Sequence, residues 1–347
     1  MKEYIHGGDI YRHPDVLDFS ANINPLGTPP AVVQAAKDSM ERICHYPDAC
    51  QEKLKQALAA YEQVPVEWLI CGNGAAELIF ALVQAVKPKR ALVMAPTFAE
   101  YAQALEAVGC EVDREILKKE DGFTLQRTIL EELQKEDLQM VFLCNPNNPT
   151  GILINPKLLR EIVTICEKRN IYLVVDECFL DFVSESEVHT LKGELEGKQY
   201  LFLLKAFTKR YAMAGLRLGY GITSSETLME KMERQLQPWN VSMPAQEAGV
   251  AALKETAYVE KARELIFQEQ AFLKDGLKAC GYPVLDSQAN YVFFEGEPDL
   301  YEKLLEEGVM IRDCSNYPGL WKGCYRIAVK LHNENEQLLR KIRKVRR

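Results

Sequence analysis

Residues 140–177 read MVFLCNPNNPTGILINPKLLREIVTICEKRNIYLVVDE. An apolar run at 140–144 is followed by a turn rich in proline and asparagine, a helical pattern over 156–168 and a second apolar run at 171–175. Short runs that are apolar throughout and joined by a helix are typical of neighbouring parallel strands buried on both faces. The stretch therefore predicts a strand–helix–strand unit of an α/β fold.

The same alternation continues on both sides of this unit. Helical patterns begin at Ala75 and around 99–108, and further apolar runs are WLIC (68–71), ALVMAP (91–96), YLFLLKAF (200–207) and LGYGIT (218–223). Strands that alternate with helices imply a mostly parallel sheet covered by helices on both faces. We expect a large α/β domain with a doubly wound, mostly parallel sheet.

A second domain is expected because 347 residues exceed what one continuous core normally holds. From about residue 242 the pattern changes to long helices over 246–280, short strands at NYVFF and CYRIAV, and closing helices at 298–307 and 333–345. We therefore predict three parts: an N-terminal arm over 1–35 that packs on the small domain, a large domain over 36–240, and a small α+β domain over 241–347.

Charge and composition argue against several classes of function. The formal net charge of −8 disfavours a surface built for nucleic acid or for anionic membranes, and we expect neither partner. The basic run RKIRKVRR (340–347) is the exception, and we interpret it as a solvated helix end. No signal-peptide core and no run of about 18 apolar residues is present, which predicts a cytoplasmic protein.

Ten cysteines occur without a CxxC pair or a short Cys/His spacing, so we expect no metal site. Several of them, such as Cys71 and Cys144, lie in apolar runs. We expect these to be buried, reduced thiols.

In open α/β sheets, ligands bind beyond the carboxyl ends of the strands, and unusual residues follow four of the apolar runs. The first group is CGNGAAE (71–77), where Gly72 and Gly74 lead into a helix whose free N–H groups could hold a phosphate. A plain tight turn is the alternative. The second is NPNNPTG (145–151), in which Asn147 and Asn148 either shape a rigid turn or face the ligand crevice.

The third group is the pair Asp176 and Glu177 at the end of a buried run. An acid there is costly unless it caps a helix or meets a cation. The fourth is FTKRYAMAGLRLGYG (207–221), which brings Thr208, Lys209 and Arg217 together. A buried lysine becomes a nucleophile when its pKa is lowered, and the hydroxyl and guanidinium are phosphate ligands.

With these four motifs in this order and spacing, the chain resembles the class I/II aminotransferase family of pyridoxal-phosphate enzymes, which have fold type I. The resemblance covers nearly the whole chain and implies pyridoxal 5′-phosphate as cofactor. It implies that Lys209 forms the Schiff base with the cofactor and that Asp176 pairs with the protonated pyridine nitrogen. Asn148 would bond the ring 3-oxygen, and the cofactor phosphate would be held by Gly74, Ala75, Ala76, Thr208 and Arg217.

The resemblance assigns three further positions. Phe98 in PTFAEY matches the aromatic residue that stacks on the cofactor ring, with ordinary core packing as the alternative. Tyr46 in HYPD matches the tyrosine that reaches the cofactor phosphate of the neighbouring subunit, which implies a homodimer with shared sites. Arg326 in YRIAV corresponds to the arginine that binds the substrate α-carboxylate through its bidentate fork.

One position departs from the broad pattern. Many relatives have a tyrosine in the motif DEAY, whereas this chain reads Asp176-Glu177-Cys178-Phe179. The phenol that touches the ring oxygen is therefore missing, and we expect Asn148 alone to make that contact.

Two branches of the family resemble the chain most, the threonine-phosphate decarboxylases of cobalamin synthesis and the histidinol-phosphate aminotransferases. The motifs HGGD (6–9), DFSANINPLG (18–27), DECFLDF (176–182) and RDCSNYPGL (312–320) favour the decarboxylase branch. A phosphorylated amino acid is then the expected substrate, with the aminotransferase reaction as the alternative.

Loss of CO₂ removes one anionic group of the substrate, so a decarboxylase gains by anchoring another group, such as a phosphate. His6, Asn22 and Arg312 are candidates for that anchor by their places in the matching motifs. Each could instead serve a turn or a surface ion pair. A ligand-sensing domain of a regulator is a third reading, which the lack of a basic face or DNA-binding motif disfavours.

Overall fold

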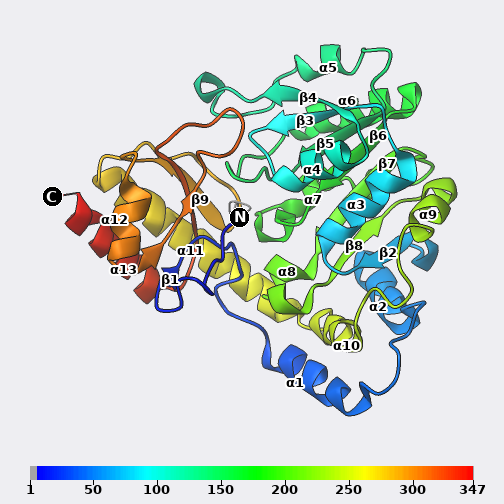
Figure 1. Ribbon diagram of the computed structural model, residues 1–347, viewed down its shortest axis with the longest axis horizontal. Coiled ribbons are helices and arrows are strands. Elements are labelled where there is room, and N and C mark those ends of the chain that lie inside the picture. The colour runs from blue at the N-terminus through cyan, green and yellow to red at the C-terminus, as the bar shows by residue number, and fades with distance from the viewer. Residues whose placement is uncertain (1–5, 347) are drawn as a thin grey trace.

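The computed structural model describes residues 6–346. Within them, the larger part of the molecule is built on a seven-stranded sheet with strand order β2-β8-β7-β6-β5-β3-β4 (Figure 1). Its strands are β2 (Leu69–Gly72), β3 (Arg90–Ala95), β4 (Glu111–Ile116), β5 (Met140–Cys144), β6 (Tyr172–Asp176), β7 (Leu201–Ala206) and β8 (Gly219–Ile222). β8 runs antiparallel to both of its neighbours, and the other neighbouring pairs are parallel. The predicted fold class is confirmed, and the comparisons below support it independently.

The central strands are buried along their whole length, as their continuous apolar sequences require. β4, which the sequence reading missed, is an edge strand with exposed and half-buried residues, and its sequence EVDREI carries too much charge to stand out as apolar. Helices cover both faces of the sheet (Figure 1). They are α2 (Glu52–Glu62), α3 (Ala75–Val86), α4 (Ala99–Ala107), α5 (Ile129–Glu132), α6 (Pro156–Arg169), α7 (Ser186–His189), α8 (Phe207–Arg210) and α9 (Glu226–Glu233).

The helix α6 of the opening stretch begins and ends where its sequence predicts. The side chain of Asn155 accepts hydrogen bonds from the backbone N–H groups of Lys157 and Leu158, and Pro156 occupies the first helical position. At the other end Asn170 adopts the left-handed conformation and stops the helix. The chain then enters β6 directly, so the helix fixes where Asp176 emerges from the sheet.

The smaller part combines a three-stranded antiparallel sheet, in the order β11-β12-β9, with three helices (Figure 1). The strands are β9 (Tyr291–Glu295), β11 (Arg312–Asp313) and β12 (Cys324–Ala328), and the helices are α11 (Thr256–Ala279), α12 (Leu300–Glu306) and α13 (His332–Val345). Its core is a separate cluster of buried side chains that includes Phe294, Tyr325 and Leu338. The N-terminal strand β1 (Leu17–Asp18) pairs in parallel with β10 (Val309–Met310), and Phe19 is buried in this smaller core.

The packing does not follow the two boundaries that we drew from the sequence. Helix α10 (Met243–Ala252) buries Ala245 and Ala248 in the larger core, although it lies beyond residue 240. Helix α1 (Pro30–Ser39) packs against α10, and its Val32 belongs to the same larger core. The segments around residues 30 and 250 therefore both belong to the larger core. Among residues 6–346, no helix combines the length and the apolar character needed to cross a membrane.

Strand register places the predicted site residues at one edge of the large sheet. Cys144 at the end of β5 pairs with Asp176 at the end of β6, and Asp176 pairs with Leu204 of β7. Since these strands are parallel, the segments that follow them emerge side by side. Asn148, Asp176 and Lys209 meet at this edge, and the smaller sheet faces it.

Candidate active site

One cavity of about 270 Å³ collects most of the residues that the sequence singled out. Twelve of the fourteen predicted site residues line it, and they are His6, Asn22, Ala75, Ala76, Phe98, Asn148, Asp176, Thr208, Lys209, Arg217, Arg312 and Arg326. Gly74 and Tyr46 are not among the lining residues. The cavity lies between the carboxyl edge of the large sheet and the smaller sheet, because β6, α3 and α8 supply one wall and β11 and β12 another.

Asp176 ends β6 and is held by two hydrogen bonds. Its Oδ2 accepts from the hydroxyl of Tyr101 at 2.6 Å, and its Oδ1 accepts from the backbone N–H of Cys178 at 2.9 Å. Burial raises the pKa of Asp176, whereas the donors from Cys178 and Tyr101 oppose that rise. Among the described residues Asp176 therefore neither caps a helix nor forms an ion pair, and its pairing with a cation stays a prediction.

Lys209 lies in the short helix α8, just after β7, with its Nζ 5.9 Å from the centre of the Phe179 ring. Burial, followed by the nearby Arg326 guanidinium, lowers the pKa of Lys209 to about 8. Lys205, four residues earlier, lies 3.5 Å from both Glu62 and Glu177, and these carboxylates raise its pKa. Of the two lysines, Lys209 therefore has the amine that can act as a nucleophile near neutral pH.

A glycine at position 74 lets an arginine lie against the beginning of α3. A Cβ built on Gly74 would lie 2.2 Å from Nη2 of Arg217, and one on Gly219 would lie 2.4 Å from the backbone N of Ala75. No side chain caps this twelve-residue helix, which leaves its first N–H groups open to a ligand, and Ala75 and Ala76 at its N-terminus line the cavity. Together with Thr208 and Arg217 they form a cradle whose chemistry fits a phosphate.

Gly74→Ala is expected to weaken binding of pyridoxal 5′-phosphate by about tenfold or more, because the new methyl group displaces Arg217. The measurement is an absorbance titration of the cofactor-free protein. Gly122→Ala is the matched control, since Gly122 also has a positive φ but a Cβ there would have nothing within 4 Å. Equal cofactor affinities in the two variants would contradict the role of the cradle.

Two arginines of the smaller sheet face the same cavity. Arg312 of β11 and Arg326 of β12 are register partners, so their side chains lie on one face of the sheet. Arg326 donates to Oδ1 of Asn148 and, through Nη2, to the carbonyl of Ser20 at 2.8 Å, while its Nε is buried without a hydrogen-bond partner among the described residues. Oδ1 of Asn22 is likewise buried and unsatisfied within residues 6–346.

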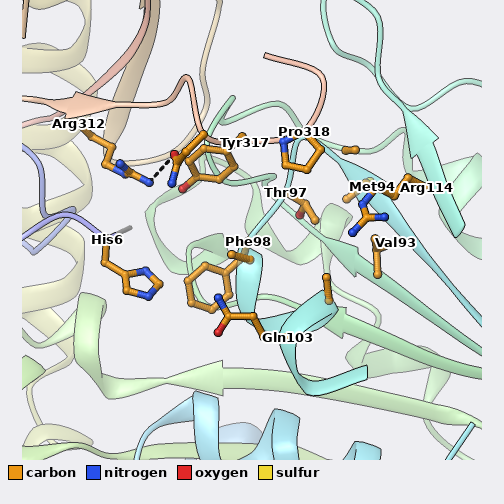
Figure 2. Close-up of a pocket in the computed structure, with 14 residues that line it drawn as sticks. His6, Val93, Met94, Thr97, Phe98, Gln103, Arg114, Arg312, Tyr317 and Pro318 are labelled. Carbon is orange, nitrogen blue, oxygen red and sulfur yellow. Dashed lines mark hydrogen bonds between the residues drawn. The ribbon is translucent and has the colours of Figure 1, made fainter. Parts of the chain in front are cut away.

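Four residues, His6, Phe98, Arg312 and Tyr317, line both this cavity and a neighbouring one of about 190 Å³, which Figure 2 shows. Arg312 Nη2 donates to Asn316 Oδ1 at 2.9 Å, drawn there as a dashed line. Burial, followed by Arg312, lowers the pKa of His6.

Glu100 contributes an acid to this region. Its Oε1 lies 3.2 Å from Nε2 of His6, and burial raises the pKa of Glu100 to about 7. Its second oxygen, Oε2, is buried without a hydrogen-bond partner in the described part of the chain. The Arg312 guanidinium and a histidine of lowered pKa therefore lie close to an acid whose pKa is near 7.

The remaining predicted residues differ in their surroundings. Phe98 is half-buried and lies edge-on to Tyr101 with ring centres 5.5 Å apart, so it both packs and faces the cavity. Phe179 lines the cavity without a polar group, as its sequence position suggested. Tyr46 is 76% exposed and stacks on Trp239 with ring centres 4.4 Å apart, outside the cavity of its own chain.

Sequence reasoning missed Glu100, Tyr101 and Tyr317, which also line the cavity. Glu100 and Tyr101 belong to the motif PTFAEY, of which only Phe98 was singled out. A signal was present, because an acid and a tyrosine in the first turn of a helix next to a ligand edge can both point inward. Tyr317 lies in the motif RDCSNYPGL, of which only Arg312 was predicted to be a site residue.

The family described as "Aminotransferase class I and II" matches residues 14–342. A threonine-phosphate decarboxylase of Salmonella typhimurium is 41% identical, and the match covers 98% of this chain and 96% of that protein. A histidinol-phosphate aminotransferase of Moorella thermoacetica is 32% identical over 95% of this chain and 86% of that protein.

Among solved structures, a histidinol-phosphate aminotransferase from Clostridium acetobutylicum superimposes with a TM-score of 0.89 at 29% identity, covering 95% of this chain and 99% of that one. Enzymes of the matching family depend on pyridoxal 5′-phosphate. The cavity fits that cofactor, because it joins a nucleophilic lysine, a buried acid and a glycine-lined phosphate cradle. The family predicted from the motifs is confirmed: this chain is a pyridoxal-phosphate enzyme and belongs to the class I and II aminotransferase family.

Proposed function

We propose that the protein decarboxylates O-phospho-L-threonine to (R)-1-amino-2-propanol phosphate, a precursor of the cobalamin side chain, in the cytoplasm. The observation that carries this proposal is the pair of register partners Arg312 and Arg326, 8% and 5% exposed, on one wall of the cavity. With Arg217 assigned to the cofactor phosphate, the two buried guanidiniums that also line the cavity match a substrate with two anionic groups. A phosphorylated amino acid has both a phosphate and a carboxylate, and the name of the 41% identical relative agrees.

When bound, the cofactor supplies an electron sink for the pair of electrons left when a bond to the substrate Cα breaks. Lys209 holds the cofactor in the resting enzyme and afterwards is a base or acid whose amine lies in the cavity. Asp176 holds a proton on the pyridine nitrogen, and Asn148 bonds the ring 3-oxygen. Phe98 stacks on the ring, while Ala75, Ala76, Thr208 and Arg217 bind the phosphate.

The substrate is held by groups from three segments of the chain. Arg326 binds the α-carboxylate, and Arg312 with His6 binds the substrate phosphate. Asn22, whose Oδ1 is buried and unsatisfied in the described part of the chain, faces the same space. An anchor on the phosphate keeps the substrate in place while its carboxylate leaves as neutral CO₂. Both arginines are needed, because Arg326 loses the carboxylate when CO₂ leaves. Arg312 then still holds the phosphate.

We further propose a homodimer in which each chain completes the site of its partner through Tyr46. The support is that Tyr46 is exposed, and that Met40, Ile43 and Trp239 are exposed apolar side chains nearby in sequence or in space. An apolar surface of this kind is typical of an interface between copies of a chain.

The test of the reaction follows CO₂ release and the amine product from O-phospho-L-threonine, with and without 2-oxoglutarate. Equal CO₂ release in both mixtures is expected, because decarboxylation needs no amino acceptor. Since 2-oxoglutarate also carries two anionic groups, the arginine pair alone does not exclude a transaminase. If histidinol phosphate reacts, and only when the oxo acid is supplied, the protein is an aminotransferase and the proposal is wrong.

Arg312→Ala is expected to reduce the preference for phosphothreonine over threonine by about 10²-fold in kcat/KM, because a phosphate then enters the cavity without its cation. Arg114→Ala is the control. Arg114 lines the neighbouring cavity on the side away from His6, but it pairs with Glu106 and does not line the main cavity (Figure 2). An unchanged preference in Arg312→Ala would show that Arg312 does not bind the phosphate.

A further inference from the structure

Tyr101 is a fully buried tyrosine whose hydroxyl reaches the acid of the site. It is the third residue of α4 and 0% exposed, and it donates to Oδ2 of Asp176 at 2.6 Å. The other carboxylate oxygen, Oδ1, accepts from the backbone N–H of Cys178 at 2.9 Å. Both oxygens of Asp176 therefore have a donor among the described residues, and the Cys178 side chain also stabilises the carboxylate.

Aromatic contacts fix the ring of Tyr101 on two sides. It stacks on Phe142 of β5 with ring centres 5.0 Å apart and planes inclined by 13°. Phe98 meets it edge-on, with ring centres 5.5 Å apart and planes inclined by 75°. A ring held in this way directs its hydroxyl at one point, so the hydrogen bond to Asp176 is preorganised.

The charge of Asp176 depends on such donors. A carboxylate taken out of water takes up a proton unless hydrogen bonds or charges stabilise its ionised form. Burial raises the pKa of Asp176, and the bonds from Cys178 and Tyr101 lower it. Tyr101 remains a donor, because burial and Asp176 raise its own pKa well above the usual range.

The other titratable groups near this pair are Cys144, Cys178, Glu100, Lys209 and Tyr291, and burial keeps the Tyr291 hydroxyl uncharged by raising its pKa well above the usual range. Burial raises the pKa of each thiol, so both stay uncharged. Glu100 opposes a negative charge on Asp176, whereas Lys209 favours it. Tyr101 supplies the one side-chain hydroxyl bonded to Asp176 among residues 6–346.

We propose that Tyr101 is a positioning residue that keeps Asp176 ionised and aimed at the pyridine nitrogen, and thereby keeps the cofactor ring protonated. This inference rests on the proposed role of Asp176. Without the hydroxyl, the carboxylate would be more basic and would compete more strongly for a proton on the pyridine nitrogen of a bound cofactor. The ring then accepts electrons less well, although every group that touches the cofactor is still present.

The test uses the holoenzyme loaded with ¹⁵N-pyridine-labelled pyridoxal 5′-phosphate, without substrate. In Tyr101→Phe the nitrogen resonance at neutral pH is expected to move from the protonated toward the unprotonated position. The dissociation constant of the cofactor is expected to rise about tenfold, which corresponds to about 1.4 kcal/mol. The substitution keeps the ring and its stacking on Phe142, so the fold should be preserved.

Tyr220→Phe is the matched control, because the hydroxyl of Tyr220 also donates to a buried carboxylate, Glu62, but neither residue lines the cavity. This variant should keep the wild-type nitrogen resonance. If Tyr101→Phe also keeps it and loses only thermal stability, Tyr101 has a structural role and the inference is wrong. Should Tyr101→Phe fail to fold, Tyr101→Met fills the space without a donor and is judged by the same resonance.

Asp176→Asn separates this inference from the function on which it rests. If Asp176→Asn shifts the nitrogen resonance and Tyr101→Phe does not, the pairing of Asp176 with the pyridine nitrogen is supported. The proposed role of Tyr101 is then wrong. If neither variant shifts it, the assignment of Asp176 to the pyridine nitrogen is itself wrong. A shift in both variants supports both interactions, that of Tyr101 with Asp176 and that of Asp176 with the cofactor ring.

Discussion

Lys209→Ala is expected to abolish turnover while the protein keeps its fold and part of its affinity for the cofactor. The loss follows because no other lysine lines the cavity among residues 6–346. Residual binding follows from the phosphate cradle at Ala75, Thr208 and Arg217, which the substitution leaves intact. The wild-type protein should be yellow, and the variant should lose the absorbance of the lysine-bound cofactor.

Borohydride reduction followed by peptide mapping should find the cofactor on Lys209 in the wild type. An adduct on Lys205, or none, would refute the assignment. The structure gives a physical reason for this choice, since Lys205 lies between Glu62 and Glu177 and stays protonated. Lys205→Met is the matched control: it should destabilise the fold by about 3–5 kcal/mol, because two buried carboxylates lose their shared cation, yet retain the adduct on Lys209.

The lowered pKa of Lys209 also predicts how cofactor loading depends on pH. With a pKa of about 8, half of the amine is neutral at pH 8. An ordinary lysine with a pKa near 10.4 is neutral there in about 0.4% of molecules. Because the neutral amine is the nucleophile, the loading rate should rise with pH up to about 8 and then level off. A rate that continues to rise toward pH 10 would show an unperturbed lysine.

The fold could be predicted from the sequence because its central strands are mostly apolar. The buried strands β5 and β7 stand out at Met140–Cys144 and Leu201–Ala206, with Lys205 as the one charged residue in them. The edge strand β4 was missed for the opposite reason, since its exposed side chains include acids and an arginine. The packing of α1 and α10 in the larger core could not be predicted from the sequence either. An apolar helix face shows that the helix is partly buried, but not against which core it packs.

Those site residues could be predicted that follow a buried strand or that belong to a motif of the family. Asp176 and Lys209 follow buried strands, so topology alone brings them to one edge. The pairing of Arg312 with Arg326 depends on the register of two short strands, which no sequence pattern fixed. Glu100 and Tyr101 were missed because a helix of mixed polarity does not show which residues of its first turn face a ligand.

Asp176→Ala is expected to lower the rate by several orders of magnitude, because the cofactor ring then stops accepting electrons efficiently. Glu177→Gln is the matched control, since Glu177 is the neighbouring buried acid. Glu177 accepts from Thr190 and from the backbone of Leu191 and does not line the cavity, so its loss should cost stability and leave the bound cofactor unchanged. The measurements are kcat, the melting temperature and the nitrogen resonance of the bound cofactor.

The two acids distinguish electronic from structural effects because they differ by one position and lie on opposite sides of β6. Loss of Asp176 should change kcat and the nitrogen resonance far more than the melting temperature, and loss of Glu177 should do the reverse. Near-normal turnover in Asp176→Ala would show that this acid only ties α4 to β6 through Tyr101. In that case the protonation of the ring must come from another group, and Glu100, whose pKa is raised to about 7, is the acid at the cavity to test next.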